Sequence, residues 1–499
     1  MSGRRELERL AATCIFPGFE GPAVPDWVRR WVADGLGGVV LFAWNVESRE
    51  QLARLTATLR AERGDVLVAT DEEGGDVTRL EAATGSSYPG NAALGVVDDV
   101  ELTEEVAAAI GADLADAGVD VDLAPVADVS TNPDNPVIGI RSFGRDPELA
   151  ARHVAAFVLG LQRVGVAACA KHFPGHGDTA TDSHLELPVV EEVDGQALLA
   201  FRAAIAAGVR AVMTAHIVVR SLGDEPSTTS PRVLHDLLRG ELAFEGLVIT
   251  DALEMRAISA GMGVEGGAVR AIAAGADALC LGHDLFEDAV CRVRDALVEA
   301  VCGGRLPEER LVEAAARVAA TASWVRRDGH DSRPGSAMRL DAGRRAARRA
   351  LAVEGEVAIG VGEGALVVEL DSEPGIAAGR LPTSPGDWLC EALPGSEVVR
   401  PEPDGQPGRV LKTARGRRVV IVVRDAHRHP WQRHVVEELL ERADDAVVLE
   451  TGIPHWRPAR ATAYVATYGA GRANLQAAAE WLYSGPRRGV EQSGSSPGS

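Results

Sequence analysis

Between residues 38 and 282 one pattern repeats along the chain: a short apolar run ends in a polar residue, and an amphipathic helical segment usually follows. This alternation is typical of βα units, in which helices connect parallel strands. The carboxyl ends of such strands meet at one face, so the polar residues that follow the runs should converge there. The clear runs cover residues 38–42, 66–70, 121–126, 166–170, 209–214, 247–250 and 278–281.

Two α/β folds are compatible with this pattern, a closed barrel and a doubly wound open sheet. An open sheet that binds dinucleotides carries a glycine-rich fingerprint after its first strand. No such fingerprint follows residues 38–42. We therefore predict an α/β fold consisting of a (β/α)8-type TIM-like barrel and a second, smaller α/β sandwich domain.

The length of the chain, 499 residues, is too great for one ordinary core, so two domains are expected. The polar, Gly- and Pro-containing segment 326–336 is typical of a linker. Beyond it, short apolar runs predict a small open sheet, with runs at 365–370, 419–423, 446–449 and 463–466. The expected boundaries are 1–335 for the barrel, 336–485 for the C-terminal α/β domain, and 486–499 for a Gly-, Ser- and Pro-rich disordered tail.

Charge and composition narrow the possible partners. A net charge of -22 at pH 7 argues against nucleic acid or an anionic membrane, because both require a concentrated basic face. No apolar stretch is long enough to predict a membrane span, and the amino terminus shows no signal-peptide pattern. Six cysteines without CxxC spacing fit a reducing compartment, so we expect a cytoplasmic protein. No sequence feature specifies an oligomeric state.

Ionisable side chains are densest in the segment KHFPGHGDTATDSH, which runs from Lys171 to His184 directly after the apolar run 166–170. Its Pro and Gly residues favour a loop, so Lys171 and His172 should lie at the end of a strand. Residues i and i+2 project to the same side of an extended chain. The Asp182 carboxylate can therefore orient the His184 imidazole and favour its charged form.

Asp251 is a second candidate, because the apolar run 247–250 ends in this carboxylate. A retaining glycosidase needs an ionised carboxylate beneath the anomeric carbon and a proton donor at the leaving oxygen. On residue type alone, the N-cap of a helix is the more frequent role for such an aspartate.

A metal site is a further alternative, and its ligands would come from His172, His176, Asp178, Asp182 and His184. The HxxxH spacing of zinc sites on helices is absent, and Pro174 with its neighbouring glycines prevents a helix. A metal-dependent hydrolase therefore ranks below a glycosidase.

The segment from Lys171 to His184 resembles the signature of glycoside hydrolase family 3, in particular its β-N-acetylglucosaminidase branch, where Lys-His-Phe-Pro-Gly-His-Gly-Asp leads to an Asp-Ser-His dyad. The resemblance covers about residues 10–350. It implies that Asp251 is the nucleophile and that His184, oriented by Asp182, is the general acid/base.

The same resemblance implies a set of ligands for sugar hydroxyls. Asp71 matches an Asp-x-Glu-Gly-Gly motif and Arg141 an Arg-Ser-Phe-Gly motif, and both are expected to bind sugar together with Lys171 and His172. An internal ion pair with Asp71 or Asp128 is the alternative role for Arg141. The sequence departs from the family at Asp76, where an arginine usually follows the paired glycines, although Arg79 remains nearby.

These features predict a retaining exo-β-N-acetylglucosaminidase that needs no cofactor and no metal. Its substrates would be small oligosaccharides derived from peptidoglycan, as in peptidoglycan recycling, or from chitin. The alternatives are a β-glucosidase of the same family, a metal-dependent barrel hydrolase, and a sugar-binding protein without catalysis. A neutral imidazole does not repel anions as a carboxylate base would, so inorganic phosphate is expected to be tolerated as an acceptor beside water. Lys171 and the backbone N–H groups of the turn at residues 175–177 would favour it.

Overall fold

The computed structural model describes residues 3–179, 181, 183, 186–193, 195–282, 286–327, 330, 332–355, 364–370, 384–401, 414, 417–443 and 445–484. Contacts divide the chain into two compact units. The first runs from Met1 to Ala350 and includes two short pieces of later chain, and the second begins at Leu351.

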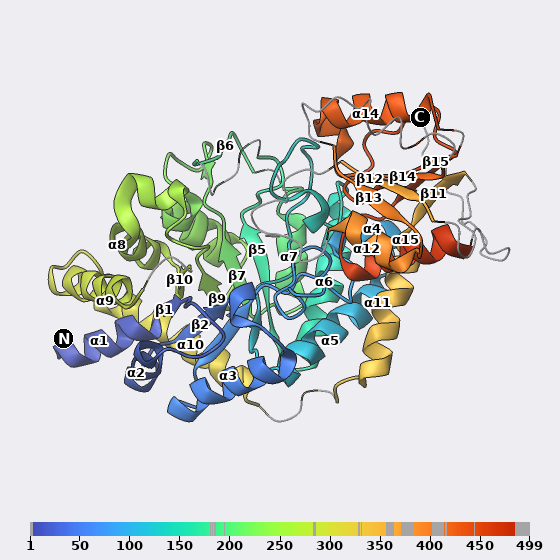
Figure 1. Ribbon diagram of the computed structural model, residues 1–499. Coiled ribbons are helices and arrows are strands. Elements are labelled where there is room, and N and C mark those ends of the chain that lie inside the picture. Colours follow the sequence, from blue (N-terminus) through green and yellow to red (C-terminus); the bar gives the residue numbers. More distant parts are fainter. Residues whose placement is uncertain are drawn as a thin grey trace. The chain divides into compact units, whose positions relative to one another are not determined.

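Parallel strands at the centre and helices outside them form the first unit (Figure 1). One curled sheet has the order β2-β3-β4-β5-β7-β9, and β1 pairs with β10. A parallel bridge from Ile249 to Ala278 links β9 to the segment that enters β10, and β1 lies beside β2. The described strands of this barrel are β1 (Ile15–Pro17), β2 (Gly38–Leu41), β3 (Leu67–Thr70), β4 (Val121–Asp122), β5 (Ala167–Phe173), β7 (Ala211–Thr214), β9 (Leu247–Ile249) and β10 (Leu279–Leu281).

The predicted α/β barrel is thus confirmed, and each predicted apolar run contains a strand. The strands are buried on both faces, which explains why they are continuous apolar runs rather than alternating ones. Every second residue of a strand points into the barrel, where an interior cluster includes Phe16, Val40, Leu67, Leu123, Cys169, Met213, Ile249 and Cys280. Sequence reasoning missed β1, because a strand from Ile15 to Pro17 is too short to form a recognisable run.

The helices cover the outside of the barrel, and their ends follow local signals. Ser48 and Asp99 cap α3 and α5 by accepting backbone N–H bonds, and Pro147 occupies the first turn of α6. Gly35 ends α2 in the left-handed conformation that glycine favours. The helices are α1 (Arg4–Thr13), α2 (Asp26–Asp34), α3 (Arg49–Glu62), α4 (Asn91–Val97), α5 (Val100–Asp116), α6 (Pro147–Arg163), α7 (Leu199–Ala206), α8 (Arg256–Ala274), α9 (Glu287–Cys302) and α10 (Glu308–Val325).

Helix α11 (Ser336–Ala350) also belongs to the first unit, which therefore extends beyond residue 335. It packs on α4 and α5 through a stripe of small residues. At Gly343 the backbones approach so closely that an added Cβ would lie 2.2 Å from the Ser87 carbonyl oxygen. Arg339 of α11 donates to Asp113 of α5 at 2.8 Å. This buried contact and the close packing hold the helix on the barrel unit.

The second unit is a six-stranded sheet of order β11-β16-β15-β14-β12-β13 in the described residues, parallel except for β11. Apolar clusters lie on both faces of the sheet, one of them against α14 (Pro430–Leu440) and the other against α12 (Pro385–Ala392) and α15 (Arg472–Ser484). This is an α/β sandwich. Its strands are β11 (Ala352–Gly355), β12 (Leu366–Glu369), β13 (Glu397–Val399), β14 (Val419–Val423), β15 (Ala446–Glu450) and β16 (Ala463–Ala466). The tail predicted at 486–499 lies outside the described residues.

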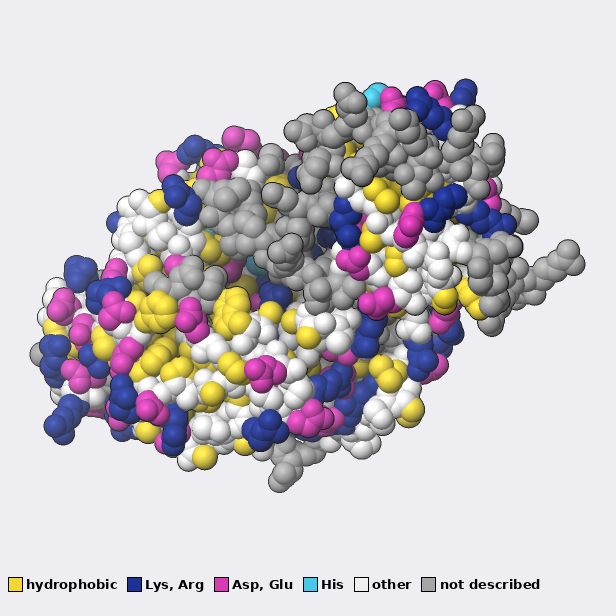
Figure 2. Space-filling view, viewed as in Figure 1, with side chains coloured by type: hydrophobic (Ala, Val, Ile, Leu, Met, Phe, Trp, Pro, Cys, Tyr) yellow, Lys and Arg dark blue, Asp and Glu magenta, His cyan; other side chains and the backbone are white. Residues whose placement is uncertain are grey.

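Acidic and basic side chains are interspersed over the face of the first unit that Figure 2 shows. Pairs one helical turn apart, such as Arg4 with Glu8 and Arg292 with Asp288, fit this pattern, and exposed pairs of this kind contribute little to stability. Within the described ranges, no helix combines the length and the apolar character that crossing a bilayer requires.

Candidate active site

The candidate site lies at the carboxyl ends of the barrel strands. Lys171 and His172 are among the last three residues of β5, Asp71 directly follows β3, and Asp251 lies two residues after the end of β9. Arg141 closes a short 3-10 turn in the connection after β4. In a parallel barrel these ends face one mouth, so side chains that are distant in sequence come together there.

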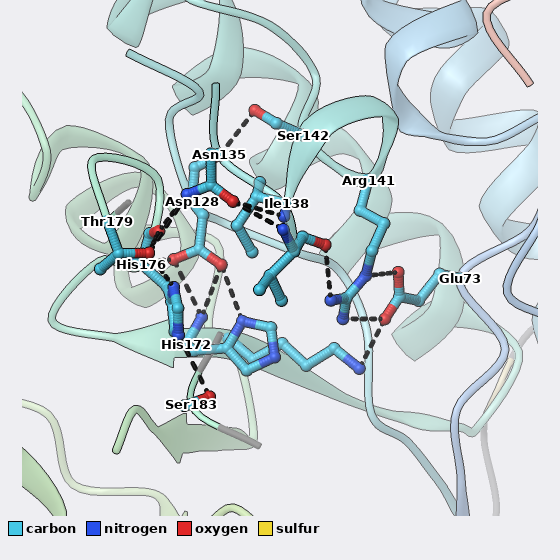
Figure 3. Close-up of polar contacts among 12 residues, drawn as sticks. Glu73, Asp128, Asn135, Ile138, Arg141, Ser142, His172, His176, Thr179 and Ser183 are labelled. Atoms are coloured by element: carbon cyan, nitrogen blue, oxygen red, sulfur yellow. Dashed lines mark hydrogen bonds and ion pairs between the residues drawn. The ribbon is translucent and has the colours of Figure 1, made fainter. Parts of the chain in front are cut away.

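A buried ammonium group is at the centre of the site. Lys171 Nζ lies 2.6 Å from Asp71 Oδ1 and 2.7 Å from Glu73 Oε1, and the lysine side chain is only 2% exposed. Arg141 binds the same Glu73 with two parallel bonds of 2.9 and 2.7 Å (Figure 3). Arg79 lies 3.6 Å from the other oxygen of Asp71. We call these groups the charged cluster. Anions and cations alternate along it, in the order Asp71, Lys171, Glu73 and Arg141.

Mutual pairing keeps the members of the charged cluster ionised. Burial alone would lower the pKa of Lys171, but Asp71 and Glu73 raise it to about 12. Burial would raise the pKa of Asp71, but Lys171 and Arg79 outweigh it and lower the value. The pKa of Glu73 is likewise held below its ordinary range, because Arg141 and Lys171 overcome the effect of burial. Fixed charged donors and acceptors of this kind suit a ligand rich in hydroxyl groups.

Glu73 is a residue that sequence reasoning missed. Arg141 does form an internal ion pair, as its alternative role required, but the partner is Glu73 and not Asp71 or Asp128. Glu73 stands in the same Asp-x-Glu-Gly-Gly motif that identified Asp71. The motif was therefore the available signal, since its glutamate connects Lys171 to Arg141.

His172 is oriented by Asp128, a second residue that was not assigned a role. The ring Nδ1 lies 2.7 Å from Asp128 Oδ2, and the same carboxylate accepts the backbone N–H groups of His172 at 3.2 Å and His176 at 2.6 Å. Burial would raise the pKa of Asp128, but His172 and these bonds lower it. Asp128 is therefore an ionised hub that fixes the ring of His172 and the start of the following turn.

Asp251 does not cap a helix, because α8 begins only at Arg256, after an N-cap at Met255. Its Oδ1 accepts the N–H of Ala252 at 2.8 Å. The ring of His216 fixes the same backbone: Nε2 lies 3.0 Å from the Ala252 carbonyl oxygen, and Nδ1 lies 2.7 Å from Thr228 Oγ1.

The charges of Asp251 and Asp71 both affect the buried thiol of Cys280. Burial raises the pKa of the Cys280 thiol well above its ordinary value, and the charges of Glu254, Asp251 and Asp71 add to the rise. The candidate nucleophile and the charged cluster therefore lie within electrostatic range of one buried thiol.

Asp182 and His184 lie outside the described residues, whereas Ser183 between them is described and buried. Asp182 and His184 are also two of the candidate ligands of the alternative metal site, so that part of the metal site lies outside the described residues as well. Among the described residues, no group of three or more His, Cys, Asp and Glu side chains is arranged to hold a metal ion.

Fold and site together define a barrel with a cluster of paired charges at its mouth, and comparison with known proteins identifies the family. Residues 18–321 match the family model described as the glycosyl hydrolase family 3 N terminal domain. The chain is 34% identical over 333 residues to beta-hexosaminidase A of Pseudoalteromonas piscicida, a match that covers 60% of this chain and 54% of that protein. It is 36% identical over 280 residues to a beta-hexosaminidase of Stenotrophomonas maltophilia, covering 54% of this chain and 82% of the relative.

A solved structure agrees with these relatives. The family 3 β-N-acetylglucosaminidase from Paenibacillus sp. FPU-7 superposes with a TM-score of 0.85 at 32% identity, covering 96% of this chain and 98% of that one. The chain belongs to glycosyl hydrolase family 3, and within it to the β-N-acetylglucosaminidase branch.

The charged cluster generates a stability prediction. Glu73→Gln keeps the size of the side chain but removes the charge between Lys171 and Arg141, so both buried cations lose compensation. The free energy of unfolding should fall by about 3 kcal/mol, measured by urea denaturation. Glu104→Gln, which removes one charge from the exposed pair with Arg163, should cost less than about 1 kcal/mol. Equal losses in the two variants would contradict the special role of Glu73.

Glu72 generates a prediction about pH. This buried side chain accepts the backbone N–H groups of Arg79 and Leu80, and burial raises its pKa from 4.5 to about 7. The folded state therefore binds the proton more tightly than the unfolded chain, and this stabilisation is complete below about pH 4.5 and is lost as the pH rises to about 7.

Glu72→Gln removes this titration. Its free energy of unfolding relative to the natural protein should rise by about 3 kcal/mol between about pH 4.5 and pH 8. Urea denaturation of both proteins at several pH values tests this. A difference that stays constant with pH would show that Glu72 does not titrate in this window.

Proposed function

We propose that this protein is a retaining exo-β-N-acetylglucosaminidase that removes terminal GlcNAc from small oligosaccharides. The observation that carries the proposal is the charged cluster at the barrel mouth, together with the Asp128-oriented ring of His172. In this cluster Lys171 and Arg141 balance Asp71 and Glu73, so the cluster as a whole has no net charge. A balanced but strongly polar surface fits a neutral sugar, whose hydroxyls need both donors and acceptors.

The roles of the reacting groups follow from the family to which the chain belongs. In the first step Asp251 attacks the anomeric carbon while His184 gives a proton to the leaving oxygen, which forms the glycosyl-enzyme. In the second step the neutral imidazole takes a proton from water, which attacks the same carbon and releases Asp251. Asp182 orients the imidazole throughout. Asp71, Arg141, Lys171 and His172 bind the hydroxyls of the terminal sugar.

The setting is proposed to be the cytoplasm, with fragments of peptidoglycan or chitin as substrates, as in peptidoglycan recycling. The six cysteines support a reducing compartment, because all of them are free thiols. The relatives named beta-hexosaminidase favour GlcNAc over glucose as the terminal sugar.

Hydrolysis is the proposed outcome of the second step. Three of the donors that were expected to attract phosphate are already engaged: Lys171 binds two carboxylates, Gly175 N–H donates to the His172 carbonyl at 2.8 Å, and His176 N–H donates to Asp128. A neutral base still tolerates an anion. What the described residues do not supply is an additional positive charge dedicated to binding it.

The substrate and the nucleophile are tested together. The kcat/KM for an aryl β-N-acetylglucosaminide should exceed that for the matching aryl β-glucoside, and preference for the glucoside would contradict the proposal. Asp251→Ala should lower kcat by about 10³-fold or more and should abolish covalent labelling by a fluorinated sugar, seen by mass spectrometry. The exposed Asp236→Ala is the matched control and should keep full activity. Activity should survive exhaustive chelation, whereas a loss that zinc restores would favour the metal-dependent alternative.

The acceptor is tested by product analysis in phosphate and in a non-nucleophilic buffer of equal ionic strength. Free GlcNAc should be the main product in both, because water is the more concentrated acceptor and the described cations nearby are paired. GlcNAc 1-phosphate as the main product in phosphate would show that the enzyme is a phosphorylase.

A further inference from the structure

The ring of His176, whose centroid lies 6.1 Å from that of the His172 ring, contacts two hydroxyl-bearing residues, Thr179 and Ser183. His176 is 2% exposed, and its backbone N–H donates to Asp128. On one side the ring Nδ1 lies 2.7 Å from Thr179 Oγ1, and on the other Nε2 lies 3.3 Å from Ser183 Oγ (Figure 3). One buried side chain thus contacts both the Thr179 and the Ser183 hydroxyls.

The His176 ring can hold both hydroxyls at once, and we call the contacts from Thr179 through His176 to Ser183 the bridge. A neutral ring has one nitrogen that donates and one that accepts, and a hydroxyl can do either, so both contacts can form in each tautomer. Burial lowers the pKa of His176 despite the opposing charge of Asp128, and His172 lowers it further while Asp251 raises it. The ring is therefore kept neutral, so it can hold two hydroxyls without bringing an additional charge into the mouth.

The near end of the bridge is fixed to the barrel. The Asn135 amide donates to the His176 carbonyl oxygen at 2.9 Å and to Thr179 Oγ1 at 3.2 Å, while its oxygen accepts the N–H groups of Val137 and Ile138. At Gly177 an added Cβ would lie 1.8 Å from the Val129 carbonyl oxygen. The turn that begins at His176 therefore packs tightly on the connection after β4 and provides a firm base for the ring.

Ser183, at the far end of the bridge, stands between Asp182 and His184 in the sequence. Its side chain is buried, with an exposure of 3%. The contact of His176 is with the Ser183 hydroxyl, and Ser183 is the one residue that joins the members of the dyad in the sequence. A side chain held at this position restrains the chain between Asp182 and His184.

We propose that His176 is a positioning residue for proton transfer: it holds Ser183, and through Ser183 it sets the geometry of the Asp182–His184 pair. The inference rests on the proposed function, in which that pair protonates the leaving oxygen. His176 is not assigned any contact with the substrate. Its effect should therefore appear only where the reaction needs a proton.

Dependence on the leaving group distinguishes this role from a merely structural one. His176→Phe keeps an aromatic ring and removes both hydrogen bonds. For an aryl β-N-acetylglucosaminide with a basic leaving group, kcat/KM should fall by about 10-fold or more, part of the 10²–10⁴-fold that general acid catalysis contributes. For a dinitrophenyl leaving group, which departs without protonation, kcat/KM should change by less than about 3-fold. Ser183→Ala, which removes only the far hydroxyl, should show the same pattern.

His216→Phe is the matched control, because His216 is also a buried ring that bridges two oxygens, but beside Asp251. Nucleophilic attack is required for every substrate, so this variant should lose similar activity with both leaving groups. The double variant His176→Phe/Ser183→Ala should be no worse than His176→Phe alone, since both changes break the same bridge.

Three results would overturn the inference: equal losses of His176→Phe on both leaving groups, additive effects in the double variant, or no leaving-group dependence in Ser183→Ala. Ser183→Ala decides the matter alone if His176→Phe does not fold. His184→Ala distinguishes a failure of the proposed acid role of His184 from a failure of the positioning role of His176. If it shows no leaving-group dependence, the acid role under the proposed function fails and the inference fails with it. If it does and the two bridge variants do not, the function stands and only the inference fails.

Discussion

The ammonium group of Lys171, buried between the carboxylates of Asp71 and Glu73, is the interaction on which the rest of the site depends. A buried charge is costly unless it is paired, and here the pairing joins the end of β5 to the segment after β3. Glu73 extends the pairing to Arg141 and so to the connection after β4. Three neighbouring parts of the barrel mouth are thereby fixed by the same requirement, that no member of the cluster is left unpaired.

Beside that cluster, three histidine rings hold other parts of the mouth in place. Asp128 holds the ring of His172 and the backbone of the next turn, while His176 connects hydroxyls within that turn. On the side of Asp251, His216 holds the carbonyl of Ala252. All three rings are buried. The rings of His176 and His216 have a hydrogen-bond partner at each nitrogen, and the ring of His172 contacts the Asp128 carboxylate. The side chains that would meet a substrate are thus supported by groups whose own positions leave little freedom.

Much of the fold could be predicted from the sequence because strands buried on both faces leave continuous apolar runs, and because a glycine- and histidine-rich segment directly follows one of them. The strand at Ile15–Pro17 could not be recognised, since it is short and gains its order from pairing with Leu279–Leu281.

The motifs led to Asp71, Arg141, Lys171 and His172, but not to Glu73 or Asp128 as their partners. Glu73 and Arg141 are separated by 68 positions, and such a pairing depends on the topology of the barrel rather than on local spacing. The polar segment after α10 suggested a domain boundary at residue 335. Helix α11 beyond it nevertheless belongs to the first unit, because its small residues permit a close approach to α4 and α5, which the composition of the linker did not reveal.

The placement of α11 has a consequence for anyone who wishes to prepare the barrel as a separate fragment. A chain cut at residue 335 would expose the apolar surfaces of α4 and α5 that Ala342, Ala346 and Ala347 cover, and would leave Asp113 without the Arg339 guanidinium. Freshly exposed apolar surface promotes self-association. A fragment that ends after Ala350 keeps this helix, so the choice of end point decides whether a loss of activity in a shortened protein reports on catalysis or only on precipitation.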